Sequence, residues 1–339
     1  MNSPLLFVCG VPRSGTTLLQ RMLDHHPRLA VANDSHFIPR ALEMTDRRLT
    51  DWAEQGRAVP LTRELKCQTF EYHRFYRLGI SREEFERSSE GAATYQELVG
   101  RLYQAFATRQ GKELAGEKTP DYLRRIRLLH GLFPTAKFIH IIRDGRDVAL
   151  SLLDWAQPDK GPGRIELWRR HPIAVCALWW SWLIEQANCQ STELPPGHLL
   201  TLRYESLVEQ PQSTLHSICQ FLNLDYAESM LQVFEHRHQP GQTTKYASAK
   251  KAWLPPTRGL RDWSSQMPAE DQEVFELLAG DTLVESGYSL NGRAPTDRSI
   301  EIAVHCRHWW NQNFLPKQHA TRPPGRGIRT VATHSKSTV

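Results

Sequence analysis

The residues best suited to chemistry lie near the start of the chain, in a glycine-containing loop between two apolar segments. Residues 5–8 (Leu-Leu-Phe-Val) predict a buried strand, and apolar residues at helical spacing from Leu18 to Leu23 predict a helix. The loop between them, Gly10 to Thr17, reads Gly-Val-Pro-Arg-Ser-Gly-Thr-Thr. A strand, a glycine loop and a helix N-terminus together direct backbone N–H groups at an anion. The sequence therefore predicts an anion-binding site at this loop.

The loop nearly matches the nucleoside-triphosphate pattern G-x-x-x-x-G-K-[ST], but it lacks the lysine. Gly10, Gly15 and Thr17 fit the pattern, whereas Thr16 stands where the lysine belongs. Because that lysine neutralises the β- and γ-phosphates, its absence argues against ordinary ATP or GTP hydrolysis. Arg13 and two hydroxyls remain, which suits a phosphosulfate that carries fewer charges than a triphosphate.

The loop also resembles that of a known family. The stretch Val-Pro-Arg-Ser-Gly-Thr-Thr, residues 11–17, is similar to the 5′-phosphosulfate loop of sulfotransferases that use 3′-phosphoadenosine 5′-phosphosulfate (PAPS). Within that family the chain most resembles the tyrosylprotein sulfotransferases and the bacterial proteins like them. The resemblance implies that PAPS is the co-substrate and that the loop binds it through Arg13, Ser14, Gly15, Thr16 and Thr17.

A second set of residues supports the resemblance. The strand predicted at 137–142 runs into Arg143-Asp144-Gly145-Arg146-Asp147 and then a helix. Arg143 and Ser151 match the family's 3′-phosphate site, where a guanidinium fork and a hydroxyl suit a terminal phosphate. Tyr204 follows the strand predicted at 199–203 and matches a tyrosine near the adenine. Tyr204 has two possible roles: it stacks on a purine base, or it packs at the edge of the core.

Three residues match the family's catalytic positions. Asp34 follows a short predicted strand, 29–32, and aligns without a gap with the family's catalytic Glu, so the resemblance implies that Asp34 takes the acceptor proton. The alternative role for Asp34 is to cap a helix N-terminus. His36 is the alternative base on the same segment, or a group that orients the acceptor. Lys118 matches the lysine of the family's Lys-x-Pro, near the transferring sulfonyl group, although a lysine beside a helix cap is more often simply solvated.

These segments predict a P-loop-like α/β fold: a parallel sheet with helices on both faces and the ligand at the carboxyl ends of the strands. Residues 45–115 are polar and aromatic-rich, and predict a helical insertion on the acceptor side. Whether its aromatic residues form a core or line a pocket is left open. The sulfotransferase-like domain is expected to span 1–290. Residues 291–339 are expected to form a basic C-terminal extension that is disordered from about 315.

Further helices and one loop follow from the later sequence. Helices are predicted at 120–132, 168–188, 213–222 and 227–235, and after Pro268. Residues 236–263 contain Lys245, Lys250, Lys251, Arg258 and Arg261. The part from Gly259 to Trp263 loosely resembles the family's basic loop that closes over PAPS, and no single residue of it stands out.

Composition limits the remaining possibilities. The chain has 339 residues, a formal net charge of +5 and 40% hydrophobic residues, as expected of one globular α/β protein. Its six cysteines are scattered without metal-ligand spacing, so we expect reduced thiols in a cytoplasmic protein and no metal. No apolar run is long enough to span a bilayer and no signal peptide is recognised, so no membrane association is expected. The modest charge suits an anionic cofactor without indicating nucleic acid.

The sequence thus predicts an enzyme that transfers a sulfonate group from PAPS to a hydroxyl, less readily to an amine. The acceptor is a small molecule, a carbohydrate or a peptide, and the sequence does not choose among them or give the oligomeric state. Two alternatives remain: a nucleotide-dependent phosphotransferase, and a binding module that kept the cofactor loops but lost turnover. Asp34 in place of Glu keeps the second alternative open.

Overall fold

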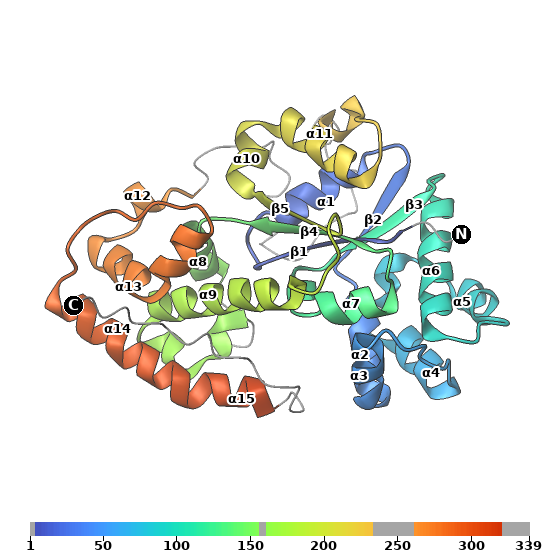
Figure 1. Cartoon of the computed structure of the whole chain (residues 1–339), viewed down its shortest axis with the longest axis horizontal. Coiled ribbons are helices and arrows are strands. Elements are labelled where there is room, and N and C mark those ends of the chain that lie inside the picture. The colour runs from blue at the N-terminus through green and yellow to red at the C-terminus, as the bar shows by residue number, and fades with distance from the viewer. Residues whose placement is uncertain (1–3, 156–160, 233–260, 321–339) are drawn as a thin grey trace, which may run out of the picture.

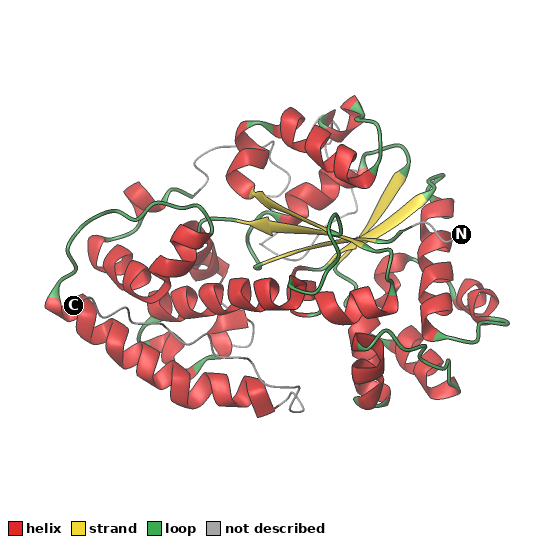
Figure 2. Cartoon of the chain, in the orientation of Figure 1, coloured by secondary structure: helices red, strands yellow, loops and turns green. Residues whose placement is uncertain are grey.

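A five-stranded, wholly parallel sheet forms the centre of the molecule, with the strand order β2-β3-β1-β4-β5. The computed structural model describes residues 4–155, 161–232 and 261–320. Its strands are β1 (Leu6–Gly10), β2 (Leu29–Asn33), β3 (Leu114–Lys118), β4 (Lys137–Ile142) and β5 (Leu199–Arg203). Figure 2 shows the strands as a single twisted sheet surrounded by helices.

Helices cover both faces of the sheet (Figure 1). One face packs on α1 (Thr16–Asp24), α10 (Tyr204–Glu209) and α11 (Pro211–Leu222), and the other lies against α7 (Ile126–Leu132), α8 (Gly145–Trp155) and α9 (Pro172–Ser191). The alternation of β1 explains this arrangement, because Leu6 and Val8 join the first core and Phe7 and Cys9 the second. The predicted parallel α/β sheet with helices on both faces is confirmed.

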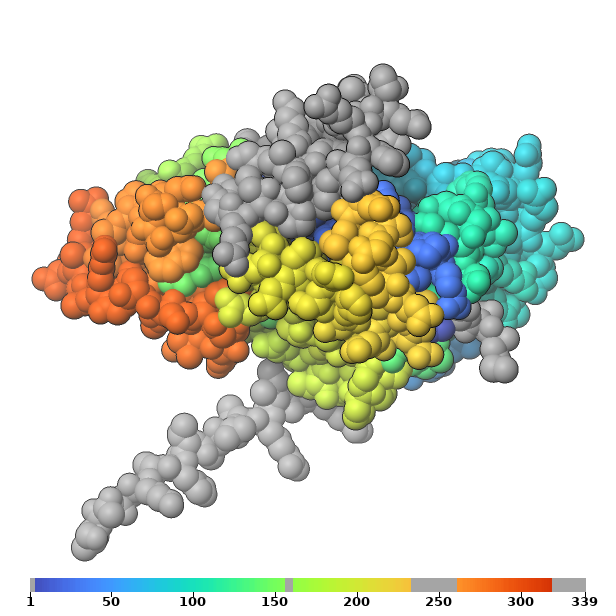
Figure 3. Space-filling view, turned by 90° about the horizontal axis from the view of Figure 1, so that it is seen from above, coloured from blue at the N-terminus to red at the C-terminus, as the bar shows by residue number. Residues whose placement is uncertain are grey.

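The remaining helices gather at the two ends of the sheet. At one end lie α2 (Phe37–Thr45), α3 (Arg48–Glu54), α4 (Arg63–Glu71), α5 (Arg82–Ser89) and α6 (Tyr95–Arg109). At the other end lie α12 (Trp263–Gln266), α13 (Ala269–Glu285), α14 (Asp297–Trp309), a π-helical turn (Trp310–Phe314) and α15 (Leu315–Ala320). Figures 1 and 3 show these two groups, blue to teal and orange to red, at opposite ends of the molecule. Short 3-10 helices lie at Phe75–Leu78 (η1), Pro120–Arg124 (η2), Gly161–Arg164 (η3), Glu166–Arg169 (η4) and Glu228–Met230 (η5).

The structure differs from the prediction at several boundaries. The expected insertion ends earlier, because α6 stops at Arg109 and the unpredicted strand β3 follows it. The helix expected at 120–132 is divided into η2 and α7 at Arg125, whose φ of -129° is not helical. The helix expected at 168–188 begins later, at the proline that opens α9. Of the helix expected at 227–235, the described residues contain only the 3-10 turn η5.

The C-terminal part packs onto the rest of the molecule. Helix α14 lies against α13 and α9, and Ala303, Cys306 and Trp310 belong to the larger core. Helix α15 shows that the prediction of disorder from about 315 is wrong for 315–320, while later residues lie outside the described part. The basic residues predicted at 245, 250, 251 and 258 also lie outside it. Within the described ranges, no helix is long and apolar enough to cross a membrane.

Candidate functional site

The glycine loop has the backbone geometry of an anion-binding turn. Gly15 precedes α1 with a φ of 88°, and Arg13 has a φ of 82°, so both lie in the left-handed region. A Cβ at Gly15 would come within 2.3 Å of the Tyr204 ring, so only glycine fits there. At the start of the loop a Cβ at Gly10 would lie 2.4 Å from the Ile141 carbonyl oxygen, where β1 and β4 approach closely. The loop is therefore held tightly between β4 and α10, at the N-terminus of α1.

The loop meets the second predicted set of residues at the ends of β1 and β4. The Nε of Arg13 donates a hydrogen bond of 2.9 Å to the Ser151 hydroxyl on α8. Arg143 donates to the Arg13 carbonyl at 3.5 Å, and its guanidinium lies 4.5 Å from the centre of the Tyr204 ring. Four predicted cofactor residues, Arg13, Arg143, Ser151 and Tyr204, thus lie together although the sequence separates them by up to 191 positions (204 − 13).

Positive charge is concentrated at this point. Burial, followed by the neighbouring charges of Arg143 and Arg261, lowers the pKa of Arg13. Arg261, the first described residue after 260, pairs with Asp154 on α8. Because guanidinium groups stay charged at neutral pH, such a cluster favours a ligand that carries several negative charges.

Two buried polar atoms at the same place have no partner. The Ser14 hydroxyl and the Nε of Arg143 are both buried and make no hydrogen bond. Buried polar groups are nearly always hydrogen-bonded, so each of these is available to an oxygen of a ligand. Ser14, Gly15 and Arg143 therefore fit a bound phosphate or sulfate ester. Thr17 is half-buried at the start of α1, whereas Thr16 is buried with its methyl group toward Gly10.

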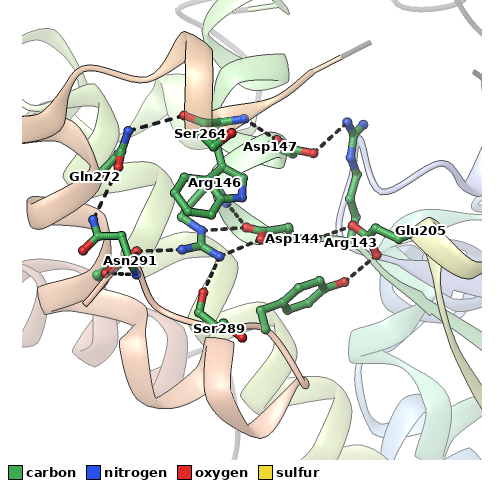
Figure 4. A network of polar contacts seen from close by, with 12 residues as sticks. Arg143, Asp144, Arg146, Asp147, Glu205, Ser264, Gln272, Ser289 and Asn291 are labelled. Atoms are coloured by element: carbon green, nitrogen blue, oxygen red, sulfur yellow. Dashed lines mark hydrogen bonds and ion pairs between the residues drawn. The ribbon is translucent and has the colours of Figure 1, made fainter. Parts of the chain in front are cut away.

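The turn that carries Arg143 is anchored by a buried ionic network (Figure 4). Arg146, only 1% exposed, donates to both oxygens of Asp144 and to Glu276 of α13. Its guanidinium also lies 3.5 Å from the centre of the Trp263 ring at the start of α12. The C-terminal helices therefore fix the orientation of the loop between β4 and α8.

Asp147 connects Arg143 to this network (Figure 4). One carboxylate oxygen lies 3.3 Å from Arg143, and the other accepts a hydrogen bond of 2.9 Å from the Trp263 backbone N–H. Burial raises the pKa of Asp147 to about 6, against the opposing attraction of Arg143. Asp147 thus links the candidate phosphate site to the helix that follows residue 260.

The candidate acid–base residues form a compact polar group after β2. The ring Nε2 of His36 lies 2.8 Å from one oxygen of Asp34, and Arg74 and Arg77 contact the other at 3.0 and 3.1 Å. Burial alone would raise the pKa of Asp34. However, the hydrogen bond from His36 and the charges of Lys118, His36 and Arg74 hold the pKa of this carboxyl well below its usual range. Asp34 is therefore a stable anion.

Neither Asp34 nor His36 caps a helix through its side chain. Both have left-handed backbones, with φ of 62° and 61°, and His36 precedes α2 without a side-chain capping bond. The helix-capping alternative for Asp34 is therefore wrong. Lys118 ends β3 beside this turn, where its carbonyl accepts a hydrogen bond of 2.7 Å from the Asp34 N–H. Lys118 is 4% exposed, so the solvated alternative is wrong as well; burial lowers its pKa, and the Asp34 charge opposes that shift.

Four residues of the site were not predicted from the sequence. Arg74 immediately precedes η1 and Arg77 lies within it, 40 or more residues from Asp34, and in sequence they are only two basic residues of a polar insertion. Asp147 lies in the charged stretch after β4, where the sequence assigns it no role. Glu117 has no motif or spacing in the sequence that marks it as part of the site.

The fold and these paired positions define a P-loop-like α/β protein with a glycine loop and an Asp34–His36 pair at the carboxyl edge of one parallel sheet. Residues 4–228, well over half of the chain, match the model of the sulfotransferase family. The chain therefore belongs to the sulfotransferase family, as the sequence predicted.

Known proteins agree with this assignment. The chain is 28% identical over 296 residues to protein-tyrosine sulfotransferase 2 of Gallus gallus, covering 86% of this chain and 71% of that protein. It is 26% identical over 337 residues to the nodulation protein NoeE of Sinorhizobium fredii, covering 91% and 74%. Among solved structures, the sulfotransferase domain of the Synechococcus PCC 7002 olefin synthase has the same fold, with a TM-score of 0.55 and 21% identity over 85% of this chain and 95% of that one.

Proposed function

We propose that this protein transfers a sulfonate group from PAPS to a hydroxyl of its acceptor. The observation that carries the proposal is the hydrogen bond from Arg13 to Ser151, which joins the glycine loop to the candidate 3′-phosphate residues. A donor with phosphate groups at both its 5′ and 3′ positions needs two anion sites at one edge of the sheet. The contacts of Arg13, Ser151 and Arg143 support two such sites.

The donor would be held by this chain as follows. The N–H groups at the start of α1, with Ser14 and Arg13, bind the phosphosulfate end. Arg143 and Ser151 bind the 3′-phosphate, and Tyr204 stands beside Arg143 to contact the base. PAPS, when bound, supplies an activated sulfonate group on its 5′-phosphate.

Transfer to a hydroxyl needs a group that removes the acceptor proton and cations that stabilise charge on the donor. Lys118 and Arg13 are placed for the second task. For the first, the Asp34–His36 pair is suited: when Nε2 of His36 donates to Asp34, Nδ1 keeps a free lone pair. We infer that Nδ1 accepts the proton and that Asp34 fixes the tautomer, although the sequence alone favours Asp34 as the base.

A hydroxyl acceptor is supported by the names of several relatives, which act on protein tyrosine, a phenol. Turnover is favoured over the second candidate, a binding module, because Asp34 contacts the His36 ring and its N–H donates to the Lys118 carbonyl.

The test measures thermal stabilisation by adenosine 3′,5′-bisphosphate and by AMP. We expect a clear rise in melting temperature with the bisphosphate and a much smaller one with AMP, because only the first can engage Arg143 and Ser151. Arg143→Ala should remove most of the difference. Equal shifts from both nucleotides, or a requirement for ATP with Mg²⁺, would contradict the proposed donor.

A further inference from the structure

Glu117 is a fully buried carboxylate that lies directly behind the candidate acid–base pair. It is 0% exposed on β3, one residue before Lys118. Six donors surround its two oxygens, and all of them are uncharged hydroxyl or backbone groups. A buried carboxylate with this many neutral donors accepts hydrogen bonds from several segments of the chain and holds them together.

The two oxygens of Glu117 serve different parts of the structure. Oε1 accepts from the Ser35 N–H at 2.8 Å, from the Ser35 hydroxyl at 2.6 Å and from the His36 N–H at 3.1 Å. It also accepts from the Thr119 hydroxyl at 2.5 Å. Oε2 accepts from the hydroxyls of Tyr103 on α6 and Tyr122 on η2. One oxygen therefore holds the turn at 35–36, and the other is held by the surrounding helices.

The turn that Glu117 holds has an unfavourable backbone. Asp34 and His36, on either side of Ser35, both have left-handed φ values, which non-glycine residues rarely adopt. Such a conformation persists only where surrounding contacts fix it. Glu117 supplies three of those contacts from the neighbouring strand, so the position of the His36 ring depends on this carboxylate.

Glu117 also connects this turn to Lys118. The residues are adjacent on β3, and the Lys118 carbonyl accepts from the Asp34 N–H. Burial, followed by the negative charge of Glu117, raises the pKa of Tyr122 well above its ordinary value; the same causes do so for Tyr103. Both tyrosines therefore keep their protons and remain donors.

We propose that Glu117 is a positioning residue, which holds the Asp34–His36 pair in register with Lys118 for transfer. The proposal rests on the function proposed above, and its test separates the two. The positioning role requires Oε1 of Glu117, which accepts hydrogen bonds from Ser35 and His36. It does not require the hydrogen bonds that Tyr103 and Tyr122 donate to Oε2.

Glu117→Met tests this directly, because methionine fills a similar volume without an acceptor. We expect its turnover to fall about 100-fold, as a misplaced catalytic group can cost. Its dissociation constant for adenosine 3′,5′-bisphosphate should stay within about twofold, since the residues proposed to bind that nucleotide follow β1, β4 and β5. In ¹⁵N spectra, the His36 ring should change from one dominant tautomer to a mixture, a result that does not depend on turnover.

Three matched variants complete the experiment. Glu117→Gln keeps a carbonyl oxygen for Ser35 and turns its amide toward the tyrosines, so it should retain most of the turnover. Ser35→Ala removes the 2.6 Å bond and should lower turnover even if Glu117→Met does not fold. Tyr122→Phe removes a bond on the other oxygen and should leave turnover nearly unchanged.

Two results would overturn the proposal. The first is wild-type turnover and an unchanged His36 tautomer in folded Glu117→Met, or in Ser35→Ala if Glu117→Met is unfolded. The second is a Glu117→Gln variant as inactive as Glu117→Met, which would assign the effect to charge and not to position. If the wild type binds no bisphosphate and shows no turnover, the proposed function fails, whereas the His36 spectrum still tests the role of Glu117.

Discussion

Replacing Asp34 by Asn should reverse the tautomer of His36. Arg74 and Arg77 both donate to the same oxygen of Asp34, so the single amide oxygen of Asn must take that position. The amide NH2 group then faces Nε2 of His36, which the carboxylate contacts at 2.8 Å. Because two donors cannot share a hydrogen bond, Nε2 becomes the acceptor and the proton moves to Nδ1. The nitrogen proposed to take the acceptor proton is then blocked.

The size of the effect follows from the loss of proton transfer. A positioned base contributes about 100-fold or more to a rate, equivalent to about 2.7 kcal/mol of transition-state stabilisation. Asp34→Asn and His36→Ala should therefore each lower turnover at least about 100-fold. Asp34→Asn also removes a negative charge near Lys118 and two arginines, so binding of adenosine 3′,5′-bisphosphate should be retained or tightened.

The assay is single-turnover transfer, with bisphosphate affinity measured separately on each variant. Asp34→Glu is the control, since it keeps a carboxylate and should retain activity. If His36→Ala keeps wild-type turnover while Asp34→Asn loses it, Asp34 itself is the base and our reasoning about His36 is wrong.

Two further predictions concern buried charges. Lys118→Met should lower turnover at least about tenfold with little change in bisphosphate affinity. Its melting temperature should be equal or higher, because the substitution removes a buried ammonium group. Unchanged turnover would exclude a role of Lys118 in transfer. The folded-state pKa of Asp147, about 6, exceeds its ordinary 3.8, so this group favours folding at low pH and loses that contribution as pH rises from about 4 to 6. Asp147→Asn should therefore raise the free energy of unfolding by up to about 3 kcal/mol at pH 7.5 and by only about half as much at pH 5; an equal gain at both would point to packing.

Local patterns in the sequence predicted the sheet and the anion loop well. The sequences of β1 and β4 are almost entirely apolar, because helices cover both faces of a central parallel strand. The loop after β1 needs glycine at positions 10 and 15, where a Cβ atom would clash with its neighbours. The resemblance then supplied Arg13, Arg143 and Ser151, which the structure brings together. Their mutual contact could not be predicted from spacing, since it depends on how β4 lies beside β1.

The strand β3 was missed for a physical reason. It reads Leu-Ala-Gly-Glu-Lys, and its two charged residues are buried, 0% exposed for Glu117 and 4% for Lys118. Propensity places such residues in loops or on surfaces, because buried charges need specific partners. The partners of Glu117 come from α6, η2 and the turn after β2, none of which a single sequence places nearby.

Asp34 and Glu117 show how two carboxylates near neighbouring strands can have different tasks. Asp34 lies among cations and a histidine, remains partly exposed, and shares a hydrogen bond with the His36 ring. Glu117 lies among neutral donors with no exposed surface, and its bonds hold backbone and hydroxyl groups in place. The charged, accessible partners of Asp34 suit a role in proton transfer, whereas the buried neutral partners of Glu117 suit a role in fixing geometry. The register of β2 on β3 sets the two side by side, so the proposed reaction depends on both.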